Sequence, residues 1–345
     1  MVRFECDYSE GALPQILDLM VKTNMEQTPG YGEDVFCEKA RELIRRECQA
    51  LDADVHFVVG GTQANKVVIQ SYLKSYQGVL SAVSGHINVH ETGTIEAGGH
   101  KVLPLPSTDG KITPRQIKKA VEDQNGDYHC VQPAMVYISN PTEYGTMYTK
   151  SELEELRKVC DRLNLPLFLD GARMGYGLAS PGNDLTLADY ARLCDVFYIG
   201  ATKVGALFGE AIVICNDNMK KDFKYNIKQN CALLAKGRLL GIQFIGLFGE
   251  EKLYYKAAQH AVDLAIKLKN AMSELGIKFM YDSPTNQQFP LLPNKVLEQL
   301  DGKYSYTVQE KIDRDNTCVR FCTSWATKEE GVDALIADLK KIYNS

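Results

Sequence analysis

Short apolar runs alternate with amphipathic stretches through the first two thirds of the chain. Runs rich in Val, Ile, Leu and Phe, separated by stretches with helical periodicity, are typical of strands buried on both faces of a sheet. The predicted strands lie at residues 55–59, 78–83, 101–105, 135–139, 165–170, 196–200 and 211–215, and the predicted helices between them at 63–76, 113–123 and 150–163. This alternation predicts an α/β fold whose large sheet is mostly parallel.

Two of the predicted helices carry start signals. Thr113 precedes Pro114, and proline is a favoured residue for the first helical position. In the stretch 150–163, Ser151 can act as the N-cap and Glu154 stands three residues later, as a capping box requires. Both helices are therefore expected to begin at these signals.

The pattern changes near residue 250. One long helical stretch covers residues 251–276, and Gly276 ends it. Short strands at 277–281, 288–292 and 317–322 and a last helix at 328–342 follow. We predict an N-terminal arm that packs elsewhere, a large domain, and a smaller C-terminal α+β domain, over residues 1–15, 16–250 and 251–345.

Composition excludes several classes of protein. Hydrophobic residues make up 45% and charged residues 24% of the 345-residue chain, which is ordinary for a globular protein with a large core. The 39 basic and 44 acidic residues give a net charge of −5, which argues against a nucleic-acid binder. The most apolar tract, 231–248, is broken by Lys236 and Arg238, so no membrane span is expected. The N-terminus has no apolar signal core and the ten cysteines form no CxxC pair, which together predict a cytoplasmic protein with reduced thiols.

A glycine-rich turn joins the first predicted strand to a helix. The sequence GGTQAN, residues 60–65, combines glycines that let the backbone approach an anion with the free amides of a helix N-terminus, which favour a phosphate. The turn has neither the Walker pattern nor the dinucleotide fingerprint. Taken alone, it is also compatible with an ordinary tight turn.

Two charged residues stand where predicted strands end. LPLFLDGAR places Asp170 at the end of a buried strand, where a carboxylate is costly unless a cation meets it. Ligands bind at such strand ends in open parallel sheets. ATKVGA places Lys203 after the next strand, where desolvation lowers the pKa of an amine and makes it a nucleophile. The alternatives are that Asp170 caps the next segment or pairs with Arg173, and that Lys203 reaches solvent.

Histidines are grouped between residues 86 and 100. His86 and His90 are four residues apart and would share a helix face, as zinc ligands do in HExxH, but Ile87 stands where that motif needs Glu. A metal site made by His86, His90 and His100 stays open at this point, although single histidines are more often structural. The sequence has no GxSxG elbow to support a serine hydrolase of that type.

A phosphate-binding turn, a strand-end aspartate and a strand-end lysine, in this order on an α/β scaffold, are the parts of a site for pyridoxal phosphate held as a Schiff base. Further segments extend the likeness over nearly the whole chain: CDYSEGALPQIL, PGYGEDVF, LDGAR, ATKVGA and CVRFCTSW. On these motifs the chain resembles the fold-type I pyridoxal-phosphate enzymes of the threonine aldolase/β-eliminating lyase family. The resemblance implies a large cofactor domain with a mostly parallel sheet and a smaller C-terminal α+β domain.

The resemblance also implies how the cofactor is held. Lys203 would form the Schiff base, and Asp170 would pair with the pyridinium nitrogen and keep it protonated. His86 would stack on the ring face. Gly61 and Thr62 would hold the phosphate with backbone and hydroxyl groups.

Four further residues would serve the cofactor or the substrate, by the same resemblance. Arg173 would lie over the cofactor beside the substrate, and Arg320 would clamp the substrate carboxylate, which suits guanidinium geometry. Arg238 would contact the phosphate from a neighbouring subunit, so that a homodimer or homotetramer would share its sites. Tyr31 belongs to the family's YGxD step near the site.

The activity that the resemblance implies is a retro-aldol cleavage of L-threonine or L-allo-threonine to glycine and an aldehyde. Arg320 would fix the carboxylate so that the Cα–Cβ bond stands perpendicular to the cofactor ring. His86, His90 or an ordered water would remove the proton of the β-hydroxyl group, since a neutral imidazole has a suitable pKa.

Three alternatives remain at this point. The chain could eliminate a β-substituent to give pyruvate and ammonia, with Lys203 as the base. It could be a metal-dependent hydrolase that uses His86, His90 and His100, or a catalytically dead protein that forms oligomers.

Several positions depart from the family's pattern. Thr202 and Val204 flank Lys203 where many relatives have SKG, and Cys6 stands where a serine is common. Residues 140–146 and 235–240 also differ from the ENTHN-like and GGGMRQ stretches. These changes leave the exact substrate open more than the cofactor.

Overall fold

The structure is a computed structural model that describes residues 1–124 and 126–344. A seven-stranded sheet lies at its centre, in the order β2-β8-β7-β6-β5-β3-β4. Strand β8 is antiparallel to both of its neighbours, and the other neighbouring pairs are parallel. All seven predicted strands are therefore present and the mostly parallel sheet is confirmed. The strands are β2 Asp54–Val58, β3 Gln77–Ala82, β4 Lys101–Leu105, β5 Gln132–Ser139, β6 Leu167–Asp170, β7 Val196–Gly200 and β8 Glu210–Ile214.

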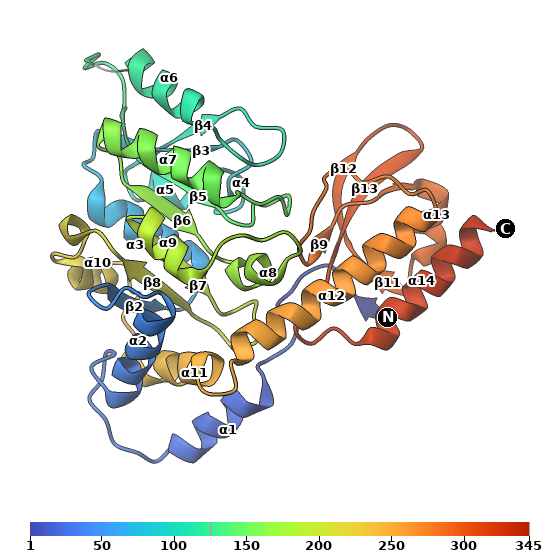
Figure 1. The fold of residues 1–345 in the computed structure, drawn as a ribbon, viewed down its shortest axis with the longest axis horizontal. Coiled ribbons are helices and arrows are strands. Elements are labelled where there is room, and N and C mark those ends of the chain that lie inside the picture. The colour runs from blue at the N-terminus through green and yellow to red at the C-terminus, as the bar shows by residue number, and fades with distance from the viewer. Residues whose placement is uncertain (125, 345) are drawn as a thin grey trace.

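Helices cover both faces of this sheet (Figure 1). Successive residues of β7 enter two different cores: Phe197 and Ile199 join a cluster with α2, α7, α9 and α11, while Val196 and Tyr198 join a cluster with α3, α5 and α10. The period of two along an extended strand produces this division. Because both faces are apolar, the strands read as continuous hydrophobic runs. The helices are α1 Pro14–Thr23, α2 Val35–Glu47, α3 Gly61–Tyr72, α4 His86–Val89, α5 Thr94–Ala97, α6 Pro114–Gln124, α7 Lys150–Leu163, α8 Met174–Ala179, α9 Leu187–Leu193, α10 Phe223–Gln229, α11 Arg238–Phe248, α12 Leu253–Glu274, α13 Asn294–Leu300 and α14 Glu329–Tyr343.

A second, antiparallel sheet is formed by the C-terminal part of the chain. Its order is β10-β13-β12, and β9 also pairs with β13. The strands are β9 Gln287–Gln288, β10 Leu291–Pro293, β12 Thr307–Lys311 and β13 Asn316–Cys322. Helices α12, α13 and α14 pack with this sheet around a third apolar core. Helix α12 connects the two parts, because its first half packs in the core of the large sheet and its second half in the third core (Figure 1).

The first residues of the chain lie against the C-terminal part. Strand β1, Val2–Arg3, pairs in parallel with β11, Tyr304–Ser305. Phe4 is fully buried in the third core. The predicted boundaries at residues 15 and 250 stay predictions.

Three local expectations were wrong. Helix α7 is capped by Thr149, with Glu152 completing the capping box, rather than by Ser151 and Glu154. Residues 277–281 form no strand and keep only an isolated bridge between Phe279 and Pro290. The run 288–292 divides between two short strands, β9 and β10.

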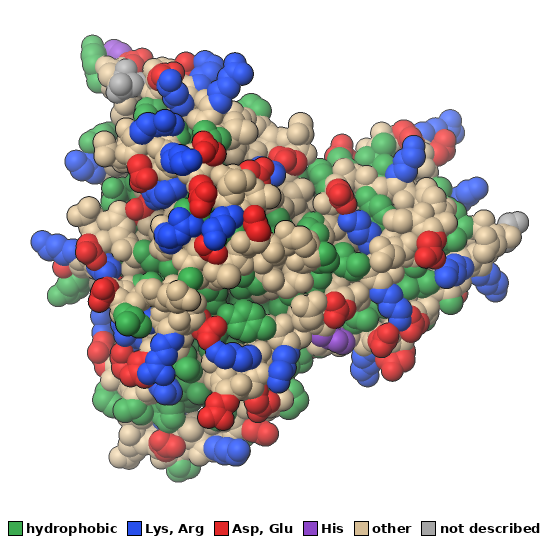
Figure 2. All heavy atoms as spheres, in the orientation of Figure 1, with side chains coloured by type: hydrophobic (Ala, Val, Ile, Leu, Met, Phe, Trp, Pro, Cys, Tyr) green, Lys and Arg blue, Asp and Glu red, His purple; other side chains and the backbone are tan. Residues whose placement is uncertain are grey.

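The surface carries both signs of charge. Figure 2 shows Lys and Arg side chains interspersed with Asp and Glu over the visible face. Among the residues that the structure describes, no helix combines the length and apolarity that a membrane crossing requires.

Candidate active site

The carboxyl ends of the parallel strands bring the candidate residues together. Asp170 is the last residue of β6, and Lys203 follows the end of the neighbouring strand β7. His86 begins α4, shortly after β3, and Gly61 begins α3, directly after β2. Because parallel strands end at one edge of a sheet, residues distant in sequence meet there.

Asp170 is a buried carboxylate with several donors. Its Oδ2 accepts hydrogen bonds from Tyr137 Oη at 2.6 Å and Asn65 Nδ2 at 3.0 Å, and its Oδ1 accepts from the amide of Ala172 at 3.0 Å. Burial alone raises the pKa of Asp170, but the charge of His86 and the hydrogen bonds from Tyr137, Tyr198 and Ala172 outweigh it and leave the pKa lowered. The group is therefore held ionised.

A hydrogen-bonded path links Asp170 to His86. Asn65 Nδ2 donates to Oε1 of Glu91 at 2.8 Å as well as to Asp170. The same Glu91 oxygen lies 3.0 Å from Nδ1 of His86. Burial lowers the pKa of His86, but the bond to Glu91 and the charge of Asp170 outweigh it and leave that pKa raised. The imidazole is thus oriented by Glu91 and favours its charged form.

Lys203 supplies the amine among the residues gathered at these strand ends. Its main-chain oxygen accepts from the hydroxyl of Tyr176, and the described residues give its Nζ no hydrogen bond or ion pair. Burial lowers the pKa of Lys203 and Arg173 lowers it further, against Asp7, Asp170 and Glu210. Lys203 is only partly exposed, and burial is the largest cause of its lowered pKa, which favours a lysine at the site over the alternative of one that extends into solvent.

A buried carboxyl group, that of Glu210, interacts electrostatically with Lys203. Glu210 begins β8, and its Oε2 accepts from the amide of Ala201 at 3.1 Å. Burial raises the pKa of Glu210 to about 8, although Lys203 lowers it. The site therefore places a neutral or weakly ionised acid beside an amine of lowered pKa.

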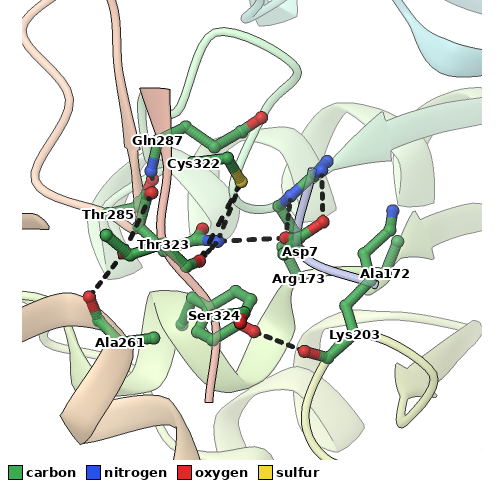
Figure 3. A network of polar contacts seen from close by, with 12 residues as sticks. Asp7, Ala172, Arg173, Lys203, Ala261, Thr285, Gln287, Cys322, Thr323 and Ser324 are labelled. Atoms are coloured by element: carbon green, nitrogen blue, oxygen red, sulfur yellow. Dashed lines mark hydrogen bonds and ion pairs between the residues drawn. The ribbon is translucent and has the colours of Figure 1, made fainter. Parts of the chain in front are cut away.

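Arg173 pairs with Asp7 rather than with Asp170. Its Nε and Nη2 donate to Asp7 Oδ2 and Oδ1 at 2.8 and 3.0 Å, and Asn286 Nδ2 donates to the same Oδ2 at 3.0 Å. Figure 3 shows Lys203 beside this pair. Burial would raise the pKa of Asp7, but Arg173 and Lys203 lower it to about 2. The N-terminal arm thus contributes a charged residue to the site.

Arg320, on β13, approaches from the C-terminal part. Its Nη2 donates to the carbonyl oxygen of Glu5 at 3.0 Å and its Nη1 to Oε1 of Gln287 at 3.2 Å. Its Nε is buried and has no hydrogen-bond partner. An unpaired buried N–H on a guanidinium is costly, so this atom is suited to an acceptor supplied by a ligand.

The N-terminus of α3 offers free main-chain amides. The first bond of the helix runs from the amide of Ala64 to the oxygen of Gly60 at 3.0 Å, so the N–H groups of Gly61 and Thr62 have no partner within the helix. The N-cap residue supplies no side-chain cap. A Cβ at Gly61 would lie 2.9 Å from Oη of Tyr198, which explains glycine there.

Two predicted site residues lie apart from this cluster. Tyr31 lines a cavity of about 230 Å³ with the N-terminal end of α2, and Lys228 Nζ lies 4.7 Å from its ring centroid. Arg238, at the start of α11, donates to the carbonyl oxygens of Glu26 and Thr23 and lines a cavity of about 450 Å³. The roles predicted for Tyr31 and Arg238 stay predictions.

The three histidines do not form a metal site. The ring centroids of His86 and His90 are 5.6 Å apart. His90 is largely exposed, and the partial burial of its ring and the charge of His86 lower its pKa. His100 is buried and its Nδ1 has no partner. In the described parts of the chain, no three His, Cys, Asp or Glu side chains are grouped as metal ligands would be.

Sequence reasoning missed several residues of the cluster. Asn65, Glu91 and Tyr137 were not predicted, since each acts only by contacting Asp170 or His86 across the fold, although Asn65 ends the quoted turn GGTQAN. Asp7 lies within the quoted motif CDYSEGALPQIL. Its charge within that motif was the signal that could have identified it as a site residue. The roles assigned to Lys203 and to its neighbours stay predictions.

Comparisons with known proteins agree with this arrangement. Residues 7–295 match the family model of the β-eliminating lyases. A low specificity L-threonine aldolase of Pseudomonas sp. (strain NCIMB 10558) is 30% identical over 350 residues, covering 99% of this chain and 98% of the relative. The structure of Leishmania major threonine aldolase is 45% identical, with a TM-score of 0.98 over 99% of this chain and 100% of that one. Thermus thermophilus aspartate aminotransferase, 13% identical, superposes with a TM-score of 0.74 over 99% of this chain and 91% of that one, which shows a common fold-type I architecture. This chain belongs to the β-eliminating lyase family.

Proposed function

We propose that this chain binds pyridoxal phosphate and cleaves L-threonine or L-allo-threonine between Cα and Cβ to glycine and acetaldehyde. The observation that carries the proposal is the amine of Lys203, unpaired and of lowered pKa, beside an ionised Asp170 at one sheet edge. The aldolases of Pseudomonas and Leishmania support the same reaction by their similarity over the full chain.

The residues present fit the proposed cofactor. The unpaired amides of Gly61 and Thr62, at the positive end of the α3 dipole, suit a phosphate. Asp170, held ionised by its donors, suits a protonated ring nitrogen, and Lys203 suits an aldehyde carbon. Bound there, pyridoxal phosphate supplies an electron sink for the bond that breaks at Cα.

The substrate carboxylate is assigned to Arg320. The unpaired Nε and the neighbouring Nη groups form a planar fork, which favours two parallel bonds to a carboxylate. The other bonds of the guanidinium, to Glu5, Gln287 and Thr307, fix its orientation. A fixed carboxylate also determines which bond to Cα breaks, because it sets how the substrate is rotated relative to the cofactor ring.

His90 is the better candidate for the base that takes the β-hydroxyl proton. A base must be neutral before it accepts a proton, and the lowered pKa of His90 keeps its imidazole neutral at pH 7. His86 has a raised pKa and its Nδ1 is engaged by Glu91. His86 is therefore better suited to lie against the cofactor ring.

Arg238 is proposed to act across a subunit interface. Within its own chain it lies among α1, α2 and α11, where Phe36 and the carbonyl oxygens of Glu26 and Thr23 contact it. A second copy of the chain would have to bring this guanidinium to the phosphate. We propose a homodimer or a homotetramer with shared sites.

The test is a spectrum of the purified protein before and after excess L-threonine, with glycine and pyruvate both assayed. A yellow band that borohydride bleaches, absent in Lys203→Ala, with glycine formed and no pyruvate, is the expected result. Pyruvate from serine or cysteine with threonine left intact would instead assign β-elimination. A protein that stays colourless with added pyridoxal phosphate would contradict the proposal.

A further inference from the structure

The segment 140–146 follows β5 and brings a carboxyl group to His86. Oε1 of Glu143 accepts a hydrogen bond from the main-chain N–H of His86 at 2.9 Å and from Oγ of Ser139 at 2.7 Å. Burial raises the pKa of Glu143, although Ser139 lowers it. This is the segment in which the sequence departs from the ENTHN-like pattern, and the proposed reaction does not use it.

Helix α4 needs an acceptor from outside its own sequence. Gly85 is its N-cap, and a Cβ there would lie 2.1 Å from Oγ of Ser81 and 3.0 Å from the oxygen of Ala82. The close approach requires glycine, and glycine has no side chain with which to cap the helix. Glu143, 57 residues later, accepts from the first helical N–H, which belongs to His86.

The contacts of Glu143 lead to Asp170 on both sides. On one side, Ser139 Oγ lies 3.4 Å from Oη of Tyr137, which donates to Asp170. On the other side, His86 leads through Glu91 and Asn65 to the same carboxylate. Glu143 therefore closes a ring of polar contacts around the site.

The segment that carries Glu143 is held from its far side by the C-terminal part of the chain. Tyr144 stacks on Tyr281 with ring centroids 4.0 Å apart and planes 8° apart. A Cβ at Gly145 would lie 2.2 Å from Oγ of Ser283, so the two backbones are in close contact. The backbone beside Glu143 is thus held by contacts that do not involve His86.

We propose that Glu143 is a positioning residue: its carboxyl oxygen holds the main chain at His86 and so keeps the imidazole on its hydrogen bond to Glu91. Its link to catalysis rests on the proposed function. The hydrogen bond needs only an acceptor oxygen, which the carboxylic acid, the carboxylate and an amide all provide. The role is therefore separable from the charge of the side chain.

Three variants test this role. Glu143→Gln keeps an acceptor oxygen at the same place, and Glu143→Ala removes it. Thr146→Val is the matched control, because it removes a hydroxyl of the same segment that bonds to Thr142 and to the oxygen of Asp109, away from His86. All three are made in the full-length protein as purified.

The readout independent of turnover is the pKa of His86, measured by NMR with labelled histidine. The chain has 6 histidines, and the signal lost in His86→Asn assigns the resonance. Glu91, Glu143, Asp170, Lys203 and His90 face this imidazole. Loss of the Glu91 bond lowers the pKa of His86, so Glu143→Ala is expected to lower it, while Glu143→Gln and Thr146→Val leave it in place.

Kinetics with L-threonine provide the second readout. In Glu143→Ala, kcat is expected to fall about 10- to 100-fold because the imidazole is misplaced, while KM changes little because Arg320 is untouched. Glu143→Gln is expected to restore kcat to within about threefold of the parent, since one neutral acceptor replaces another.

Two results would overturn the proposal. One is a Glu143→Ala protein whose His86 keeps its pKa while the melting temperature and kcat fall together, which would mean a purely structural role. The other is a Glu143→Gln protein as impaired as Glu143→Ala, which would mean that the charge is required. A protein without aldolase activity would contradict the proposed function alone. The NMR titration of His86 would still show whether Glu143 positions the imidazole.

Discussion

Two regions that the same family motifs single out are built in different ways. Asp170 and Lys203 lie at adjacent strand ends, and each is surrounded by residues of its own chain. Tyr31 and Arg238 lie near the start of α2 and of α11, where Tyr31 is 45% exposed. Sheet topology alone brings the first pair together. We propose that Arg238 serves that site from another copy of the chain. Substitutions in the first region should therefore act within one subunit, and substitution of Arg238 should act through assembly.

The largest effect is expected for Lys203→Ala. Removing the amine removes the proposed nucleophile, and kcat for L-threonine is expected to fall by about 10³-fold or more. Steady-state kinetics and the visible spectrum with added pyridoxal phosphate measure it. The control is Lys118→Ala, an exposed lysine on α6, which should keep both. A Lys203→Ala protein with substantial activity would remove the basis of the comparison.

A smaller loss is expected for Arg320→Lys, and it should fall on substrate binding. Lysine keeps the charge but lacks the planar fork, so KM for L-threonine is expected to rise about 10- to 100-fold, with kcat changed much less. Arg314→Lys is the matched control, since this arginine is exposed at the turn between β12 and β13. An unchanged KM in Arg320→Lys would assign the carboxylate to another group.

How much of each region the sequence predicts depends on how far apart in the sequence the contacting residues are. The seven strands of the large sheet and the two strand-end charges were predictable because an apolar run and the residue that ends it are neighbours in sequence. The pairing of Arg173 with Asp7 spans 166 residues and that of Asn65 with Asp170 spans 105, so no local pattern reports them.

The sequence did not predict two other elements correctly, and each error has a physical reason. Helix α11 is apolar on nearly all sides, with Leu240, Ile242, Phe244 and Leu247 all buried, so its periodicity is weak and the tract 231–248 gave no helix. The predicted strand at 277–281 is replaced by loop contacts, such as the stacking of Tyr281 on Tyr144. Tertiary packing overrides local preference at both places.

Arg238→Ala tests the second region. We expect about tenfold weaker binding of pyridoxal phosphate, because one charge-assisted bond is lost. The decisive step is to mix this variant with Lys203→Ala, unfold and refold the mixture, and assay it. If two subunits share each site, random pairing regenerates about a quarter of the sites with both residues intact. Activity no greater than the sum of the two separate variants would place Arg238 outside the partner's site.

The smallest effect distinguishes the two histidines of the first region by pH. A base works in its neutral form, so kcat/KM falls as the pH drops below the pKa of that base. The pKa of His90 is lowered from an ordinary 6.5, whereas that of His86 is raised. If His90 is the base, kcat/KM for L-threonine should stay level down to pH 6.5 and fall only below it, and His90→Gln should abolish this acid limb. A decline that begins above pH 6.5 and persists in His90→Gln would assign the proton to His86, and the bond from Glu91 would then tune the base itself.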